Sequence, residues 1–413
     1  MISIKFKYSK IFHKFKSKFI IIKYSLIFII VIVIILILNN NTLINKKKNN
    51  KFISNIINIH NNSNLFENSF KYKKLGINYL NKCKRSISNN ITKISDNTMP
   101  TFSIIIPVFN CQTTIELSII SILNQKFMDF EIVLVNDFSS DNSLQKIINI
   151  QKNNKRIKIL NNKRNMGTLY SRCIGTLKSK GTYIIPLDND DLFMSDILFE
   201  NIYKINKYYD FDIIEFKSFQ IKNYNPNIND LEEGLFNHHL NNIVVNQPEL
   251  SLFPISKNNK YAYNDFWIWD KCIKSKIYKK SIKSLGKKRF SIYNCWTEDI
   301  SMVFIIFSFA QSCFFFDFYG VFHILATNTA SNILNFNHKL YTEIFLLDII
   351  FDFSKNNEKN KKYAVYKALE IANNNIYILN LKEQMYLKYI IKKLLKSKYI
   401  NNDDKILIHD KFK

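Results

Sequence analysis

The sequence contains little glycine, proline and cysteine, with seven, six and six residues respectively in a chain of 413. The six cysteines are widely spaced, and no Cys-x-x-Cys pair or Cys/His cluster occurs. This spacing gives no indication of a zinc site and defines no disulfide framework. Because the chain is rich in Ile, Asn, Lys and Phe along its whole length, we interpret the scarcity of glycine and proline as a compositional bias rather than a functional signal.

The chain is strongly basic, with 59 Lys and Arg against 33 Asp and Glu and a formal net charge of +26. Such a charge is compatible with nucleic acid or an anionic membrane surface as a partner. The lysines, however, are scattered, and no RNA-binding aromatic motif, zinc-finger spacing or helix-turn-helix pattern accompanies them. We therefore expect no nucleic-acid partner.

The N-terminal segment has the pattern of a membrane anchor. Residues 1–18 carry six lysines, and residues 19–38 are apolar except for one lysine and one serine. Roughly 20 apolar residues cross a bilayer as a helix, and no small-residue cleavage site follows Leu38. We expect a basic cytoplasmic tail, a single-pass signal anchor and the rest of the chain on the lumenal (Golgi or ER) or extracytoplasmic side. Lys46–Lys48 follow the span as well, so the cytosolic face stays open, as does a buried helix in place of an anchor.

Residues 39–98 are dominated by Asn, Lys, Ser and Ile and are typical of a low-complexity stem or linker, with a helical pattern around Leu65–Leu80. From Met99 onward, strand and helix patterns alternate, which predicts an α/β domain with a parallel sheet. The expected strands are 103–108, 131–135, 157–160, 183–187 and 212–219, and the expected helices are 113–124, 141–151, 167–178, 195–208 and 298–315.

Polar side chains follow three of the predicted strands. Asn110, Asp137 and the pair Asp188 and Asp190 each come directly after an apolar run. Ligands of open α/β sheets bind at this carboxyl edge of the strands. Two carboxylates spaced two residues apart in extended chain point the same way and repel, and a hard divalent cation that also binds phosphate would neutralise them. The same acidic stretch also fits a turn that caps the next helix, with Asp191 or Ser195 as N-cap.

These segments together resemble the N-terminal part of glycosyltransferase family 2. The resemblance is dense over 102–219 and thinner to about 331, and it implies an α/β GT-A fold, which is a Rossmann-like, mostly parallel sheet with flanking helices. It also implies a nucleotide-diphosphate sugar donor and a divalent metal ion, Mn²⁺ or Mg²⁺. The matching segments are Phe102–Asn110, Ser121–Gln125, Phe130–Asp137, Phe138–Ser143, Asn165–Gly167, Arg172 and Gly181–Asp191.

The resemblance assigns donor-binding roles by position. Pro107, Val108 and Asn110 would line the nucleotide pocket. Asp137 would accept a hydrogen bond from the ring N–H of uracil or guanine. Arg172 would lie near the diphosphate, where a guanidinium suits phosphate oxygens, although a helix-surface arginine is an ordinary alternative.

The resemblance also assigns the metal ligands and the catalytic base. Asp188 would lie by the donor ribose or the metal ion, and Asp190 would be the principal metal ligand, with Asp191 as a substitute. Glu298 and Asp299 begin an apolar helix, where acidic residues are also ordinary N-terminal residues. In the family the aspartate of such a pair is the base, which removes the proton of the acceptor hydroxyl and gives inversion, while Glu298 would orient it.

Two further features near the C-terminal half are open to interpretation. The segment Trp267–Lys271 resembles a Trp-Asn-Lys motif that precedes the acceptor region of the family, and its rings would stack on a sugar or pack in the core. His323 follows a strand-like run and would close over the donor. The domain boundaries that we expect are 99–334 for the GT-A domain, with a nucleotide-sugar half at 99–220 and an acceptor half at 221–334, and a helical, lysine-rich region at 335–413.

The sequence therefore predicts a membrane-anchored, metal-dependent inverting glycosyltransferase that takes a UDP-sugar, with GDP left open, and glycosylates a hydroxyl of a glycan, lipid or protein. The alternative is a catalytically inactive GT-A-like scaffold or sugar-binding module on the membrane. A nucleotidyltransferase would need a Gly-rich, basic loop after the first strand, where this chain has Pro107-Val-Phe-Asn-Cys-Gln112.

Overall fold

The computed structural model describes residues 65–86, 99–233, 242–246, 267–292 and 297–325, together with separate positions between 342 and 392. The chain divides into two compact units, Met1–Glu67 and Asn68–Lys413. Among the residues described, no helix is long and apolar enough to span a bilayer. The predicted anchor at 19–38 lies outside the described residues, so it stays a prediction, as do the domain boundaries.

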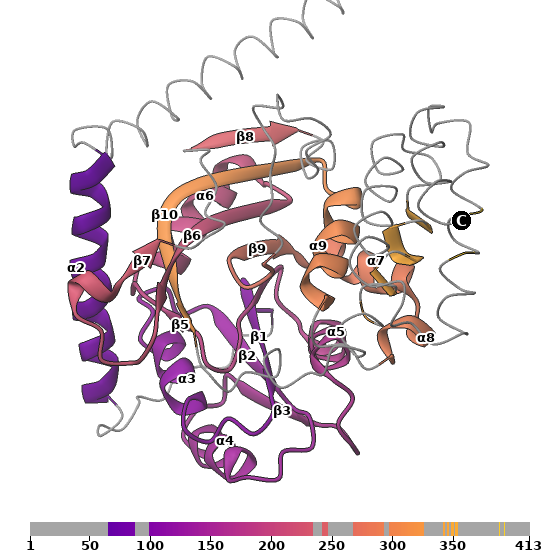
Figure 1. The fold of residues 1–413 in the computed structure, drawn as a ribbon, viewed down its shortest axis with the longest axis horizontal. Coiled ribbons are helices and arrows are strands. Elements are labelled where there is room, and N and C mark those ends of the chain that lie inside the picture. The colour runs from indigo at the N-terminus through magenta and orange to yellow at the C-terminus, as the bar shows by residue number, and fades with distance from the viewer. Residues whose placement is uncertain are drawn as a thin grey trace, which may run out of the picture. The chain divides into compact units, whose positions relative to one another are not determined.

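The described strands form one ten-stranded sheet in the order β3-β2-β1-β4-β9-β6-β10-β5, with β7 on β6 and β8 on β10 (Figure 1). Its first four strands are parallel to one another. They are short β-branched runs, and β1 and β4 are buried along their whole length, as expected for parallel strands covered on both faces. These strands are β1 (Phe102–Val108), β2 (Phe130–Asn136), β3 (Ile157–Asn161) and β4 (Tyr183–Pro186).

The other part of the sheet makes the fold mixed, and the expectation of a mostly parallel sheet is wrong. β9 (Lys271–Lys274) lies between β4 and β6 (Ile213–Ile221) and is antiparallel to both. β6 is parallel to β10 (Ser312–Ile324), which in turn pairs antiparallel with β5 (Leu192–Phe193). β9 is only four residues long and contains two lysines, so its sequence carries no strand pattern to detect. The remaining antiparallel strands are β7 (Glu232–Glu233) and β8 (Ile243–Asn246).

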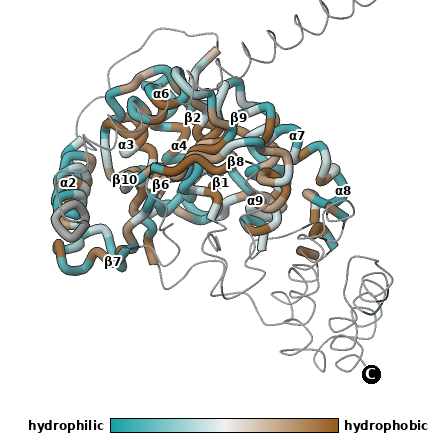
Figure 2. The backbone as a smooth tube through the Cα atoms, turned by 90° about the horizontal axis from the view of Figure 1, so that it is seen from above, coloured by the Kyte–Doolittle hydropathy of each residue, from teal (hydrophilic) through white to brown (hydrophobic). Residues whose placement is uncertain are grey.

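Helices cover the sheet, and the hydrophobic residues gather in its central strands (Figure 2). One core packs α5, α7 and α9 against side chains of β1 and β2 such as Ile105 and Val133. A second core joins α2 and α3 to β5 and to the ends of β6 and β10. The helices are α2 (Leu65–Ser86), α3 (Ile115–Leu123), α4 (Ser143–Lys152), α5 (Thr168–Lys178), α6 (Leu198–Tyr209), α7 (Ser275–Leu285), α8 (Lys287–Phe290) and α9 (Glu298–Phe309), with a 3₁₀ turn at Ile228–Asp230.

Two elements differ from the sequence prediction. The helix expected to reach Phe315 ends at Phe309, and the aromatic run after it forms β10, since aromatic residues favour strands. α2 lies within the predicted stem, yet Tyr79, Leu80 and Cys83 are buried against the sheet domain. This part of residues 39–98 is therefore a packed helix rather than a linker.

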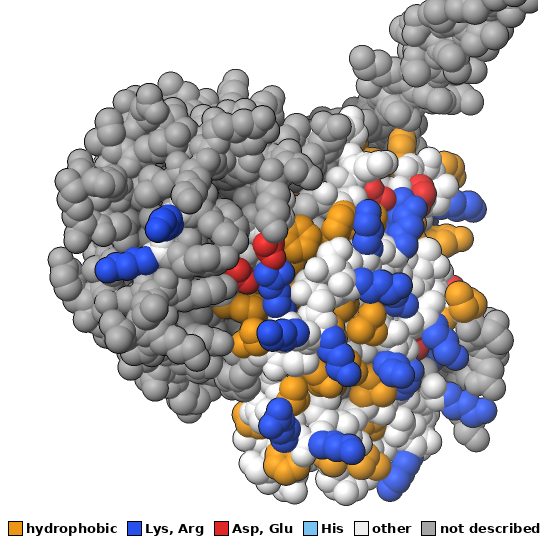
Figure 3. Space-filling model, turned by 90° about the vertical axis from the view of Figure 1, so that its right-hand side faces the viewer, with side chains coloured by type: hydrophobic (Ala, Val, Ile, Leu, Met, Phe, Trp, Pro, Cys, Tyr) orange, Lys and Arg blue, Asp and Glu red, His pale blue; other side chains and the backbone are white. Residues whose placement is uncertain are grey.

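Lysine and arginine side chains are spread over the face shown in Figure 3, separated by hydrophobic and neutral side chains and a few carboxylates. This distribution agrees with the scattered lysines of the sequence.

Candidate active site

The carboxyl ends of β1, β2 and β4 lie side by side, and the polar residues that follow them contact one another. The main-chain N–H of Asp137 donates to the Val108 carbonyl at 2.8 Å, and the Asn189 side chain donates to the Pro107 carbonyl at 3.0 Å. Asn110, in a left-handed conformation with φ of 46°, accepts a hydrogen bond from the Ser140 N–H at 2.8 Å. The structure thus brings the predicted donor-binding residues to one edge of the sheet.

The carboxylate of Asp137 is hydrogen-bonded by other groups of the protein. It accepts hydrogen bonds from the Asn162 side chain at 2.7 Å and from the N–H groups of Met166 and Gly167 at 2.9 and 2.8 Å, and the residue is 3% exposed. Asp137 therefore holds the loop that leads into α5, where Gly167 has a φ of 86°. Its contact with a nucleotide base stays a prediction.

Arg172 lies at the centre of the site and is 2% exposed, which excludes a helix-surface arginine. Its guanidinium pairs with Asp188 at 2.5 Å, directly with Asp299, and with Glu298 at 3.9 Å. Burial works against its charge, but the carboxylates of Asp299 and Asp188 outweigh it and raise the pKa of Arg172. One buried cation on α5 thus joins the acidic residues after β4 to the acidic pair that begins α9.

Glu298 and Asp299, the acidic pair at the start of α9, are weaker acids than free carboxyl groups. Burial, more than any neighbouring charge, raises the pKa of Glu298 to about 8 and of Asp299 to about 6, and the Arg172 charge opposes both shifts. Within the described residues, Glu298 Oε2 is buried without a hydrogen-bond partner. Both groups of the pair therefore hold a proton more readily than free carboxyl groups do, which brings them closer to the working pH of a general base.

Asp191 does not cap the following helix, because its carboxylate is turned into the protein. It is fully buried, accepts a hydrogen bond from the Ile324 N–H at 2.9 Å and lies 3.1 Å from Nδ1 of His323. Burial disfavours the charged imidazole, but the Asp191 carboxylate outweighs it and raises the pKa of His323 to about 9. The ring of His323 also stacks on Trp269, with centroids 4.8 Å apart and planes at 10°.

The tryptophan segment packs beside this pair. Trp269 is 2% exposed and therefore belongs to the core, whereas Trp267 is partly exposed and stacks 5.8 Å from it. The main chain of Ile268, between them, hydrogen bonds to the Asp299 carboxylate and lowers its pKa, although less than burial raises it. This segment connects the stacked His323 to the acidic pair on α9.

Asp190 differs from its neighbours. Within the described residues, no side chain makes a hydrogen bond or ion pair to its carboxylate, and burial together with Asp191 and Asp188 raises its pKa to about 8. A carboxylate in these surroundings would be stabilised by a bound cation. No group of three or more His, Cys, Asp and Glu side chains in the described part of the chain is arranged to hold a metal ion. Asp190 with Asp188 fits an ion that takes only one or two carboxylates and completes its shell with phosphate and water, as Mg²⁺ does.

Sequence reasoning missed several groups that support the site. Ser118 on α3 and Tyr224 after β6 donate hydrogen bonds to the main chain of residues 189–191. A serine in the apolar segment Ile115–Leu123 was the available signal for the first, since a buried polar side chain needs a partner. No signal pointed to Tyr224.

Residues 103–258 match the model of the family described as Glycosyl transferase family 2. An uncharacterized glycosyltransferase of Haemophilus influenzae is 40% identical over 100 residues, which cover 24% of this chain and 40% of that protein. The GalNAc(5)-diNAcBac-PP-undecaprenol beta-1,3-glucosyltransferase of Campylobacter jejuni is 38% identical over 112 residues, 27% of this chain and 36% of that protein. The matches thus span less than half the length of these relatives.

The fold is similar to that of TarS 1-349 from S. aureus, whose crystal structure was solved in complex with UDP-GlcNAc. The two chains superpose with a TM-score of 0.55 over 75% of this chain and 87% of the other, at 14% identity. At that identity the likeness extends to the fold alone.

Proposed function

We propose that this chain, whose residues 103–258 match the model of glycosyltransferase family 2, is an inverting glycosyltransferase that moves a sugar from a nucleotide diphosphate to a hydroxyl acceptor. The observation that carries the proposal is the position of Arg172, which pairs with Asp188 after β4 and with Asp299 at the start of α9. Asp188 and Asp299, which are 111 positions apart in the chain, are thereby held around one buried positive charge. A single displacement requires the donor site and the base to lie close together in this way.

Asp299 is the proposed base. A sugar hydroxyl is a poor nucleophile and must lose its proton as it attacks the anomeric carbon. Attack from the side opposite the leaving diphosphate inverts the configuration, as in an inverting hydrolase in which the acceptor replaces water. The Arg172 charge favours the ionised form of Asp299, and Glu298, next to it in the chain, is proposed to orient the carboxylate.

Asp190, with Asp188, would hold a divalent metal ion, Mn²⁺ or Mg²⁺, and the ion would supply positive charge at the diphosphate leaving group. Asp191 is not proposed as a metal ligand, because its carboxylate pairs with His323 and accepts the N–H of Ile324 at the end of β10. Pro107, Val108 and Asn110 would line the nucleotide pocket at the end of β1.

The donor is proposed to be a UDP-sugar. The TarS structure of similar fold was solved with UDP-GlcNAc. The Asp137 carboxylate, which already accepts three hydrogen bonds from the protein, would accept the ring N–H of uracil with a remaining lone pair. The acceptor is proposed to be a hydroxyl on a glycan, a lipid-linked sugar or a protein. The relative from Campylobacter jejuni is named for an undecaprenyl-diphosphate-linked acceptor.

Residues 19–38 are proposed to anchor the enzyme in a membrane as a single span, with the catalytic domain on the lumenal or extracytoplasmic side. The support is the apolar run after a lysine-rich tail. Protease treatment of sealed vesicles tests the orientation: protection of the C-terminal region supports it, and digestion in sealed vesicles places the domain on the cytosolic face.

The first test of the donor site uses the purified full chain, with UDP-glucose, UDP-GlcNAc and GDP-mannose each added with and without Mn²⁺. A ligand at 100 times its dissociation constant stabilises a fold by about 2.7 kcal/mol, which a thermal shift detects. Stabilisation by one nucleotide class that requires Mn²⁺ is the expected result. A folded sample that no nucleotide sugar stabilises would instead indicate the inactive scaffold.

A further inference from the structure

The main chain around Asp190 is held by side-chain hydroxyl groups at three consecutive carbonyls. Ser118 Oγ lies 2.9 Å from the Asn189 carbonyl and 2.7 Å from the Asp191 carbonyl. The hydroxyl of Tyr224 donates to the Asp190 carbonyl at 2.8 Å. A serine hydroxyl has one hydrogen, so Ser118 shares it between the two carbonyls that flank Asp190. The backbone on both sides of Asp190 is therefore fixed from α3 and from the segment after β6.

The side chains next to Asp190 are fixed as well. Asp188 pairs with Arg172, and Asn189 donates to the Pro107 carbonyl. Asp191 is held by His323 and the chain at β10. Among the acidic side chains of this loop, only the Asp190 carboxylate has no side-chain partner within the described residues, while its backbone is held on three sides. Such an arrangement leaves one carboxylate available and restricts where it can point.

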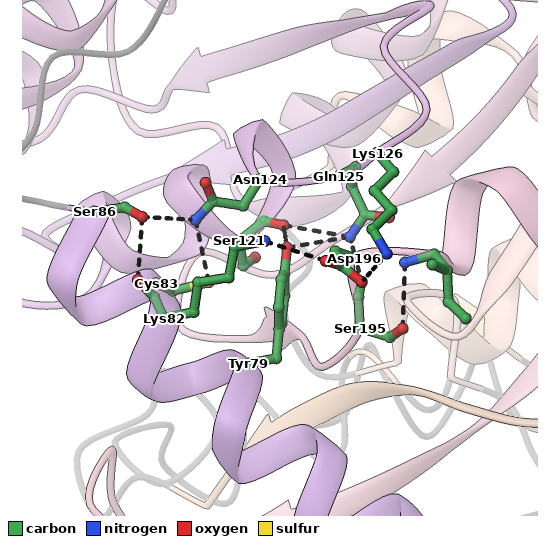
Figure 4. Close-up of polar contacts among 11 residues, drawn as sticks. Tyr79, Lys82, Cys83, Ser86, Ser121, Asn124, Gln125, Lys126, Ser195 and Asp196 are labelled. Carbon is green, nitrogen blue, oxygen red and sulfur yellow. Dashed lines mark hydrogen bonds and ion pairs between the residues drawn. The ribbon is translucent and has the colours of Figure 1, made fainter.

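Side chains of α3 and of the residues just after it also bind the main chain beyond residue 191 (Figure 4). Ser121, one turn after Ser118, accepts a hydrogen bond from the Phe193 N–H at 3.1 Å. Gln125, which follows the C-terminal end of α3, donates to the Ser195 carbonyl and accepts from the Phe199 N–H at 3.3 Å. Ser118 and Ser121 are three residues apart and therefore lie on one face of α3. Ser118, Ser121 and Gln125 together bind the main chain at residues 189, 191, 193, 195 and 199.

α2 supports α3 from outside the matched family region. Tyr79 donates its hydroxyl to the Ser121 carbonyl at 2.7 Å, and Lys82 pairs with Asp196 at 3.1 Å (Figure 4). Gly76 allows the close approach, because a Cβ there would lie 2.5 Å from the ring of Phe322 and 2.7 Å from Met194. The loop after β4 is therefore held by α3 and by α2, a helix that precedes the matched residues 103–258.

We infer that Ser118 and Tyr224 are positioning residues, whose hydroxyl groups orient the Asp190 carboxylate toward the metal-bound diphosphate of the donor. This inference rests on the proposed function, since it concerns the same site. Loss of either hydroxyl leaves a buried carbonyl without its donor and frees the peptide on one side of Asp190. Partners that orient a metal ligand, when removed, typically cost 10–100-fold in metal affinity.

The test measures Mn²⁺ binding directly, from the electron paramagnetic resonance signal of free Mn²⁺ in the presence of UDP and the purified full chain. Ser118→Ala and Tyr224→Phe are each expected to weaken Mn²⁺ binding about 10-fold. The matched control is Ser281→Ala. Ser281 is a fully buried helical serine on α7 whose hydroxyl bonds to the Ile277 carbonyl in its own helix at 3.0 Å, and its loss is expected to leave Mn²⁺ affinity unchanged.

The outcomes separate this inference from the proposed function. If the wild-type chain binds no Mn²⁺ with UDP or GDP, the proposed function and the inference both fail. If the wild-type chain binds Mn²⁺ and the two hydroxyl variants bind it as tightly as Ser281→Ala does, only the inference fails. Tyr224 is partly exposed, so Tyr224→Phe decides the question even if Ser118→Ala does not fold.

Discussion

Replacing Arg172 by methionine should destabilise the fold and do so more at alkaline than at acid pH. The guanidinium is buried among three carboxyl groups, and its removal leaves them without a cation. Breaking a buried ion pair by removing one partner typically costs about 3–5 kcal/mol. We expect a loss of that size in the free energy of unfolding of Arg172→Met at pH 8, where Asp299, with a pKa of about 6, is ionised.

The pH dependence follows from the direction of the pKa shifts. Burial raises the pKa values of Glu298 and Asp299 in the folded state, so their protonated forms are favoured by folding. The stability that such groups contribute is fully present below their unfolded pKa and is lost as pH rises through the folded pKa, here to about 6 for Asp299 and about 8 for Glu298. Without Arg172 this loss of stability with rising pH is larger. The difference in the free energy of unfolding between wild type and Arg172→Met should therefore become smaller as the pH is lowered from 8 to 5.

Urea unfolding of the two proteins at pH 5 and pH 8 measures both effects. The matched control is Arg289→Met, since Arg289 also contacts two carboxylates, Asp348 and Asp352, but is partly exposed. Exposed pairs typically contribute about 0–1 kcal/mol, and a small loss is expected there. If Arg172→Met were no less stable than Arg289→Met at pH 8, the assignment of Arg172 as the charge that holds the site together would be wrong.

Three further results are expected. The value of kcat/KM for sugar transfer should fall as pH is lowered through about 6, because Asp299 must be ionised to accept a proton; a flat profile from pH 8 to pH 5 would contradict its role as base. Asp190→Ala should abolish the Mn²⁺-dependent part of the thermal shift with UDP while leaving the unliganded melting temperature near that of the wild type, and a retained shift would remove Asp190 from the metal site. Gly76→Val should lower the free energy of unfolding by about 1–3 kcal/mol, because its side chain would overlap Phe322, and an unchanged melting curve would mean that α2 is not packed as described.

The parallel strands could be predicted from the sequence because their signal is local. β1 is expected at 103–108 and found at Phe102–Val108, and β2 is expected at 131–135 and found at Phe130–Asn136. A run of β-branched residues that ends in a polar residue fixes both the strand and the edge of the sheet at which that residue lies. For the same reason Asn110, Asp137 and Asp188 were expected on one edge.

The rest depended on contacts between distant parts of the chain. The pairing of Arg172 with Asp299 joins residues 127 positions apart, and no periodicity encodes it. The antiparallel entry of β9 between β4 and β6 is likewise set by tertiary packing, because four residues with two lysines have no strand pattern of their own. The packing of α2 was missed because its polar composition resembled the low-complexity segment around it.

The central claim is that Asp299 acts as the base, next to a donor site to which Arg172 links it. The most direct measurement compares UDP release from UDP-sugars by the wild-type chain and Asp299→Asn, with Mn²⁺ and a set of lipid-linked and glycan acceptors, alongside Mn²⁺-dependent UDP binding by both proteins. The account predicts a fall in kcat of about 10²–10⁴-fold with UDP binding unchanged. Transfer by Asp299→Asn at the wild-type rate would contradict it.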